Sequence, residues 1–96
     1  MENAIIAVGL PWYRKADYPK SLDIMADADL LPVSHHDWQQ KAEHLERELG
    51  AKGMRTIRAI IDPQTFPAWC TARGLDINAK ARTTFANETA YRQARQ

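Results

Sequence analysis

Two short segments with β-strand character constrain the fold more than any other feature of this 96-residue chain. Residues 4–10, "AIIAVGL", are a short apolar run with three β-branched side chains, closed by Gly9 and Pro11. Residues 54–62, "MRTIRAIID", alternate side chains between two faces of a strand, with Arg58 on the more polar face. Helical spacing of apolar residues fills most of the remaining chain. The sequence therefore predicts an α+β fold in the order β-α-α-β-α-α, with residues 1–96 forming a single domain.

Four helices are predicted from capping residues and apolar spacing. We expect them at about 18–29, 34–50, 65–74 and 76–92. Asp17, Ser34 and Thr65 would begin the first three, and Gly50 and Gly74 would end the second and third. The residues expected to face the core are Tyr18, Leu22 and Met25, then Trp38, Ala42, Leu45 and Leu49, then Phe66, Trp69 and Cys70, and finally Ile77, Ala81 and Phe85.

The predicted sheet has two or three strands and is covered on one face by about four helices. Two strands alone make a marginal sheet, and each exposes one unpaired edge. A strand from a second chain would satisfy such an edge. We therefore expect a homodimer, with the N-terminal strand exchanged or paired across the subunits.

Charge and composition exclude several classes of protein. The net charge is +1, although residues 1–51 carry five Lys/Arg against nine Asp/Glu and residues 52–96 carry eight against three. This split favours complementary charged faces, or an acidic partner for the second half, over a dedicated DNA-binding domain. A single cysteine allows no internal disulfide, and no apolar run approaches the ~20 residues of a membrane span. Because "MENAIIAVGL" also lacks the basic start of an export signal, we expect a cytoplasmic protein without a membrane partner.

The segment "SHHDWQQKAEH", residues 34–44, contains every histidine of the chain. Ser34 and Asp37 are explained by capping of the helix that begins there. His36 and His44 lie about 12 Å apart along a helix, too far to share one metal ion, and the adjacent His35 and His36 point in different directions. We therefore predict no metal site. An acid–base role for His35 with Asp37 stays open, because His35 lies near both the core boundary and a carboxylate.

Cys70 is the one potential thiol nucleophile. Its place on the stripe with Phe66 and Trp69 favours a small buried hydrophobic residue over a reactive thiolate, although Arg73 lies three residues on. The glycine-rich and nucleophile motifs of nucleotide-binding proteins and hydrolases are absent, and we predict no cofactor.

A candidate binding surface comes from "PWYRK", where Trp12 and Tyr13 precede Arg14 and Lys15. Aromatic and cationic side chains are enriched at protein interfaces and also stack on single-stranded nucleic acid. The alternative is that the two aromatics close over the core while the two cations stay in solvent. His35 and Arg58 complete the set of candidate binding residues.

The sequence identifies no catalytic constellation. Its leading functional prediction is a small non-catalytic interaction module that self-associates as a homodimer and binds an unidentified protein partner. A nucleic-acid-binding accessory protein is the second candidate. A small enzyme using His35 with Asp37, or Cys70, is the third.

Overall fold

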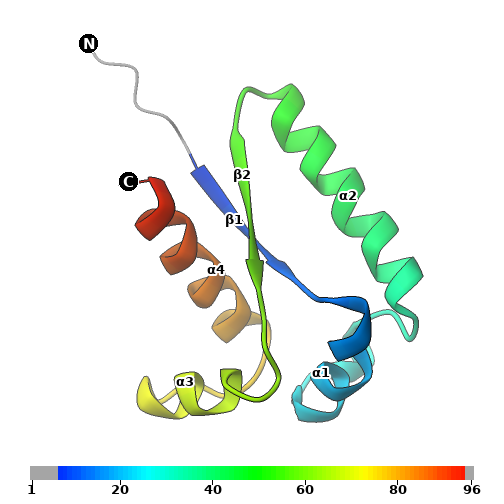
Figure 1. The fold of residues 1–96 in the computed structure, drawn as a ribbon, viewed down its shortest axis with the longest axis vertical. Helices are drawn as coiled ribbons and strands as arrows, with labels where there is room; N and C mark the ends of the chain where they lie inside the picture. Colours follow the sequence, from blue (N-terminus) through cyan, green and yellow to red (C-terminus); the bar gives the residue numbers. More distant parts are fainter. Residues whose placement is uncertain (1–6, 95–96) are drawn as a thin grey trace.

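The computed structural model describes residues 7–94 and contains two strands and four helices (Figure 1). Strand β1 (Ala7–Trp12) leads through two single-turn 3-10 helices, η1 (Lys15–Asp17) and η2 (Ala28–Leu30), which flank the first α-helix. The α-helices are α1 (Tyr18–Ile24), α2 (His35–Ala51), α3 (Phe66–Ala72) and α4 (Ala79–Ala94), and β2 (Arg55–Ile60) lies between α2 and α3. This confirms the α+β class and the order β-α-α-β-α-α. In the described residues the sheet has two strands.

The two strands run parallel, with Ala7 beside Arg55 and Trp12 beside Ile60. The predicted strand 4–10 begins in residues outside the described range and extends further than expected, through Pro11 to Trp12. The main-chain N–H of Ile61 donates to the carbonyl of Trp12 at 2.9 Å, which shows that Trp12 directs its backbone groups toward β2. Because this direction alternates along a strand, Pro11 directs its ring nitrogen to the outer edge. A proline is tolerated there, since it removes no hydrogen bond between the strands.

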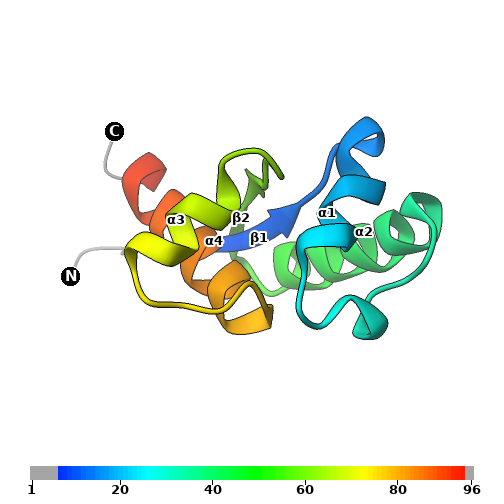
Figure 2. The ribbon, with the colours of Figure 1, turned by 90° about the horizontal axis from the view of Figure 1, so that it is seen from below.

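Helices lie against both faces of the sheet, which corrects the prediction of a single covered face. Helix α4 packs along both strands on one side. A Cβ atom at Gly9 would meet the Ala86 carbonyl of α4 at 1.9 Å, so glycine permits this close approach. On the opposite face, Trp12 contacts Trp38 of α2. Helices α4 and α2 therefore lie on opposite sides of the two strands, as the two views show (Figures 1 and 2). The two edges of the sheet lie between these helices.

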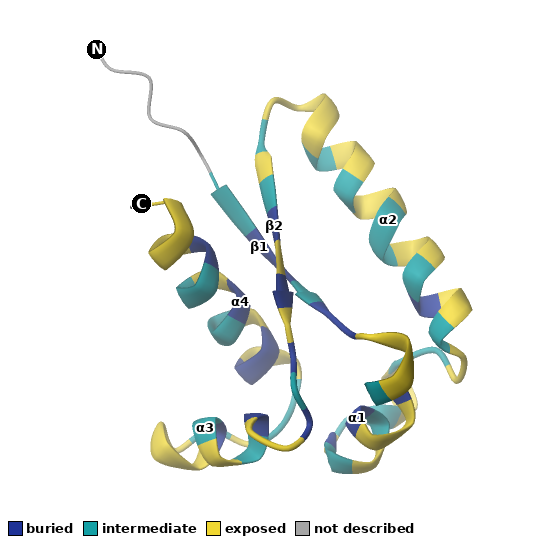
Figure 3. Cartoon of the chain, viewed as in Figure 1, coloured by how far each residue is buried: buried dark blue, intermediate teal, exposed yellow. Residues whose placement is uncertain are grey.

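The core follows the predicted stripes, with one exception. Burial is concentrated between α4 and the sheet and where α1, α2 and α3 meet the carboxyl ends of the strands (Figure 3). The expected residues that are buried are Tyr18, Met25, Trp38, Phe66, Cys70 and Ala81. Leu45 is the exception, because 43% of its surface is exposed.

The helix boundaries differ from the predicted ones most in the first and fourth helices. The first helix ends at Ile24, where the chain becomes extended and the Ala26 N–H donates to the carbonyl of Ile77 at 2.7 Å. The fourth begins at Ala79, because the Asn78 side chain accepts a hydrogen bond from the Ala81 N–H at 3.2 Å, and it continues beyond Arg92 to Ala94. Within residues 7–94, no helix combines the length and apolar character needed to cross a bilayer.

Candidate functional site

An aromatic cluster closes the carboxyl end of β1. Its rings are those of Trp12, Tyr13, Tyr18, His35 and Trp38. The Trp38 ring meets Trp12 and Tyr13 edge to face, with centroids 5.0 Å apart in both pairs. Such T-shaped contacts are the favoured geometry for aromatic pairs. The cluster thereby joins β1, the segment after it and the first turn of α2.

His35 belongs to this cluster through its ring and one hydrogen bond. Its Nε2 lies 2.8 Å from the main-chain carbonyl oxygen of Tyr13, so this nitrogen carries the proton and donates. Asp37 instead uses its main-chain N–H to donate to the Ser34 hydroxyl at 3.1 Å, the predicted N-cap bond. In the described part of the chain, no bond joins His35 to the Asp37 carboxylate. The structure therefore ties His35 to the β1 backbone.

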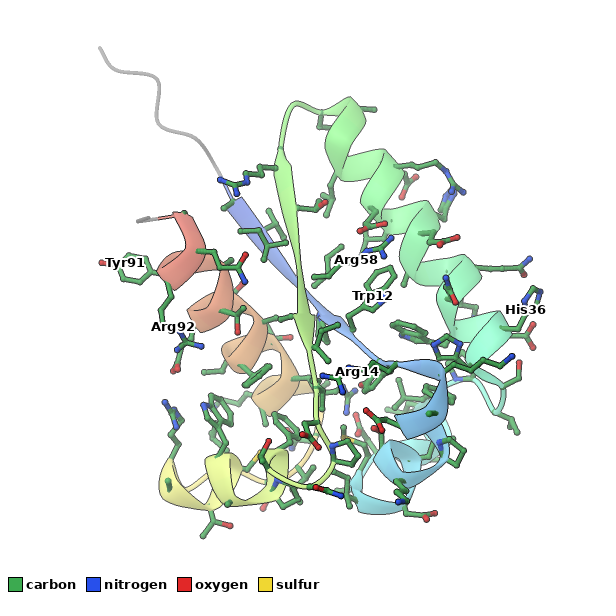
Figure 4. The ribbon with its side chains drawn as sticks, in the orientation of Figure 1. Trp12, Arg14, His36, Arg58, Tyr91 and Arg92 are labelled. Carbon is green, nitrogen blue, oxygen red and sulfur yellow. The ribbon has the colours of Figure 1, made fainter. Side chains whose placement is uncertain are left out.

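The other two histidines lie away from the cluster. His36 is exposed on the outer side of α2 (Figure 4), and His44 pairs with Glu48 at 3.4 Å one turn further along. Among residues 7–94, no three His, Cys, Asp or Glu side chains converge in a manner that could hold a metal ion.

Arg58 connects Trp12 of the aromatic cluster to Glu46, further along α2. Its guanidinium carbon lies 3.9 Å from the centroid of the Trp12 ring, a cation–π contact (Figure 4). The same guanidinium donates to both carboxylate oxygens of Glu46, at 2.7 and 2.9 Å. These hydrogen bonds lower the pKa of the Glu46 carboxyl. Two of the predicted binding residues, Trp12 and Arg58, are therefore in direct contact.

The segment "PWYRK" divides into buried and exposed residues. Trp12 and Tyr13 are 6% and 2% exposed. Arg14 and Lys15 are exposed, and Arg14 forms a surface ion pair with Asp17 at 3.7 Å. This arrangement is the alternative considered above, in which the aromatics close over the core and the cations remain in solvent.

Cys70 is 1% exposed, and burial raises the pKa of its thiol. A raised pKa disfavours the nucleophilic thiolate at neutral pH. The guanidinium of Arg73 lies over the Trp69 ring at 4.2 Å and donates to Glu88 at 3.0 and 3.3 Å. Cys70 accordingly has the surroundings of a core residue.

An ion pair between α4 and the segment after α1 was not among the residues predicted from the sequence. Arg82 donates to both carboxylate oxygens of Asp27, at 2.7 and 2.9 Å, and to the Met25 sulfur at 3.3 Å. The side chains are only 9% and 15% exposed. Hydrogen bonding from Arg82 lowers the pKa of the Asp27 carboxyl. Arg82 and Asp27 are 55 residues apart in the sequence. The one sequence feature that could have indicated the pair is that Arg82 directly follows Ala81, a residue predicted to face the core.

A pocket of about 310 Å³ opens beside the outer edge of β1, between α2 and the segment that follows α1. We call it the β1-edge pocket. Its walls come from β1 and the residue after it, the loop before α2, α2 itself and α4, namely Leu10, Pro11, Tyr13, Leu30, Leu31, Pro32, Trp38, Lys41, Ala42, Leu45 and Arg82. Among the described residues, two cations and no carboxylate line it. A second hollow lies near Tyr91 and Arg92, which Figure 4 labels, and within the described residues its lining comes from α4.

Two buried hydroxyls have no hydrogen-bond partner among the described residues, those of Tyr13 and Ser21. Buried polar groups are normally paired, so each requires an explanation such as an ordered water. Burial raises the pKa of Tyr13 to about 12, with the Arg82 charge acting in the opposite direction. The Tyr13 hydroxyl therefore remains protonated, and can donate, throughout the neutral range.

Comparison with known proteins gives one similarity. Proline--tRNA ligase 1 of Streptomyces avermitilis is 30% identical over 87 residues, which cover 88% of this chain. The match spans only 15% of the ligase. No family model matches the chain, and no solved structure matches it significantly.

Proposed function

We propose that this chain is a non-catalytic protein-interaction module that acts as a homodimer, joined through the outer edge of β2. The observation that supports this most directly is the difference between the two sheet edges. In the described residues β2 pairs with β1 alone, so its outer edge is available to another strand.

The outer edge of β2 is unbroken. Ile61 directs its N–H toward β1, and successive residues of a strand direct their backbone groups to opposite sides. The backbone groups of Thr56, Arg58 and Ile60 therefore point away from β1. Residues Arg55–Ile60 contain neither proline nor glycine, and Ile60 is 37% exposed. The outer edge of β1 lacks one donor at Pro11 and lies beside the pocket. Pairing through β2 is therefore favoured over the exchanged or paired N-terminal strand expected from the sequence.

An antiparallel pair of β2 strands about a two-fold axis at Ile57 fits this edge. Thr56 of one copy then faces Arg58 of the other, and these residues exchange main-chain hydrogen bonds. The alternative axis at Arg58 would set two arginines directly opposite each other, which is unfavourable. The resulting sheet has four strands in the order β1-β2-β2-β1, a more stable size than two.

Matched proline substitutions at the two edges test the proposal. Thr56→Pro removes an outward N–H of β2, and Ala7→Pro removes one from β1 by the same alternation. Size exclusion with light scattering should give a dimer for the parent chain and for Ala7→Pro at about 50 micromolar, and a monomer for Thr56→Pro. Circular dichroism confirms that each variant is folded. A monomeric parent chain, or a Thr56→Pro variant that remains dimeric, contradicts the proposal.

Nucleic-acid binding is the second candidate, and the similarity to a tRNA ligase favours it. The net charge of +5 in residues 52–96 is compatible with phosphate contacts. Fluorescence anisotropy with labelled tRNA and a duplex control, measured from 50 to 300 mM salt, tests it. Binding through phosphates requires affinity that falls steeply with salt, and no detectable binding at low salt removes this candidate.

An enzymatic role through His35 with Asp37, or through Cys70, has the least support, because His35 binds a main-chain carbonyl and Cys70 is buried. The cytoplasm remains the proposed location, since the lone cysteine suits a reducing compartment.

A further inference from the structure

The β1-edge pocket adjoins the sheet edge that the proposed dimer leaves free. We propose that this pocket binds a small apolar carboxylate, with the apolar part between β1 and α2 and the carboxylate toward Lys41 and Arg82. The proposal concerns a ligand site separate from the dimer interface, and each can fail without the other.

Size and lining fit a small ligand. The volume of about 310 Å³ lies at the lower end of the range for small-molecule sites. Most of the wall is apolar or aromatic, with Leu10 on the sheet side, Leu31 on the loop, and Trp38 and Ala42 on α2. Such walls with a few polar groups are the usual composition of ligand sites.

The charge of the lining selects an anion. Lys41 is exposed at the α2 side of the pocket, and Arg82 reaches it from α4. Asp27 is the acidic partner of Arg82, but it is not part of the lining. Within residues 7–94, a ligand in the pocket therefore meets two cations and no carboxylate.

Arg82 is positioned to donate further hydrogen bonds. A guanidinium has five N–H groups, and three are used by Asp27 and the Met25 sulfur. The Nε–H and one Nη2–H remain. The Arg82 side chain is largely buried, and Asp27 already fixes its guanidinium. The carboxylate of a ligand therefore meets N–H donors that lose little conformational freedom on binding.

The neighbouring Tyr13 ring is part of the same wall, and its buried hydroxyl is a donor without a partner in the described residues. Because this hydroxyl has almost no accessible surface, a ligand in the pocket meets Tyr13 through its ring, and the two cations attract the carboxylate.

Binding is tested with hexanoate as the probe, using ¹⁵N chemical shifts and tryptophan fluorescence on the full chain. Hexanol is the neutral analogue of similar length, and hexylamine the cationic one. We expect saturable shifts that map to the residues of the β1-edge pocket. Hexanoate should bind about tenfold more tightly than hexanol, the effect of a hydrogen bond to a charged group. Equal affinity for hexanoate and hexanol, or shifts that map elsewhere, overturn the proposal.

Two lysine variants give a matched control. Lys41→Gln should weaken hexanoate binding roughly threefold, as expected for one exposed charge, whereas Lys52→Gln removes an exposed charge outside the pocket and should change nothing. Ala42→Leu, which fills part of the pocket, should abolish binding. Both lysine positions are exposed, so these variants fold and keep the test decisive. Equal effects of the two lysine variants contradict the assignment.

The Thr56→Pro variant separates this site from the proposed dimer. If that variant is monomeric and binds hexanoate with the affinity of the parent chain, the two sites are independent. A loss of hexanoate binding in a folded Thr56→Pro monomer contradicts a pocket formed within one copy.

Discussion

Helices α4 and α2 cover opposite faces of the same two strands, and they do so in different ways. Helix α4 approaches through small residues: Ala81, Ala86 and Ala90 are at most 2% exposed, and the Ala86 carbonyl lies against Gly9. Helix α2 meets the sheet through large rings and a guanidinium, with Trp38 against Trp12 and Glu46 holding Arg58. The first face is packed backbone to backbone, and the second through side chains.

This difference explains where the pocket lies. Close packing of small residues on the α4 face leaves no room for a ligand and little tolerance for added atoms. Large side chains hold α2 further from the strands, so the space between Leu10 and Leu45 is only partly filled. The α4 face therefore stabilises the fold, and the pocket opens on the α2 side, with Arg82 of α4 reaching its wall.

Two glycine substitutions test the contrast most severely. In Gly9→Ala the new Cβ would lie 1.9 Å from the Ala86 oxygen and 2.4 Å from its carbon, so backbone must move. We expect a loss of about 4 kcal/mol or more in the free energy of unfolding, measured by urea denaturation. Gly50→Ala is the control, because nothing lies within 4 Å of its Cβ position in α2. It should stabilise by about 0.5–1 kcal/mol. Similar stabilities for the two variants would show that α4 does not approach the sheet so closely.

The two arginine–carboxylate pairs differ in burial and should differ in energy. Arg82→Met leaves the largely buried Asp27 without a partner, which should cost about 3 kcal/mol. Arg58→Met removes a pair whose arginine side chain is 45% exposed, together with the contact to Trp12, and should cost about 1 kcal/mol. Urea denaturation of both variants measures the difference. An Arg58→Met effect as large as that of Arg82→Met would contradict the contrast between the two faces.

The Asp27–Arg82 pair also predicts an acid dependence of stability. The pKa of Asp27 is lowered from its ordinary value of 3.8 by hydrogen bonds from Arg82. Since the folded state binds this proton less readily than the unfolded state, the stabilisation is present above about pH 4 and is lost as the pH falls through the lowered folded value. Urea denaturation between pH 2 and 6 should give a steeper acid decline for the parent chain than for Asp27→Asn. Parallel curves would mean that other carboxylates control the acid transition.

Local patterns in the sequence predicted most of the elements, and long-range packing decided the rest. The Ser34 cap, the Thr65 start of α3 and the Phe66–Cys70 stripe depend on nearby residues, and the structure confirms them. The sequence predicted that the strand ends before Pro11, because proline breaks strands, but its nitrogen points to the unpaired edge. That direction depends on which side β2 pairs, which no local pattern encodes. The sequence also predicted helices on one face of the sheet. The packing of α2 on the second face depends on long-range contacts that local patterns do not encode.

The same reason explains what was missed at the candidate site. Trp12, Tyr13, His35 and Arg58 were selected as individual candidates, and the structure joins them around Trp38. Arg82 and Asp27, which come together from distant segments, have no local pattern that would pair them.

The smallest expected effect concerns the unpaired Tyr13 hydroxyl on the α2 side of the molecule. Tyr13→Phe keeps the ring and its contacts with Tyr18 and Trp38 and removes only a buried donor without a partner in the described residues. Removing such a group should leave stability unchanged or raise it by up to about 1 kcal/mol. The same measurement on Ser21→Ala, the other unpaired hydroxyl, is the matched case. A loss of more than about 1 kcal/mol in Tyr13→Phe alone would mean that this hydroxyl is paired in solution, through a water bound beside the β1-edge pocket.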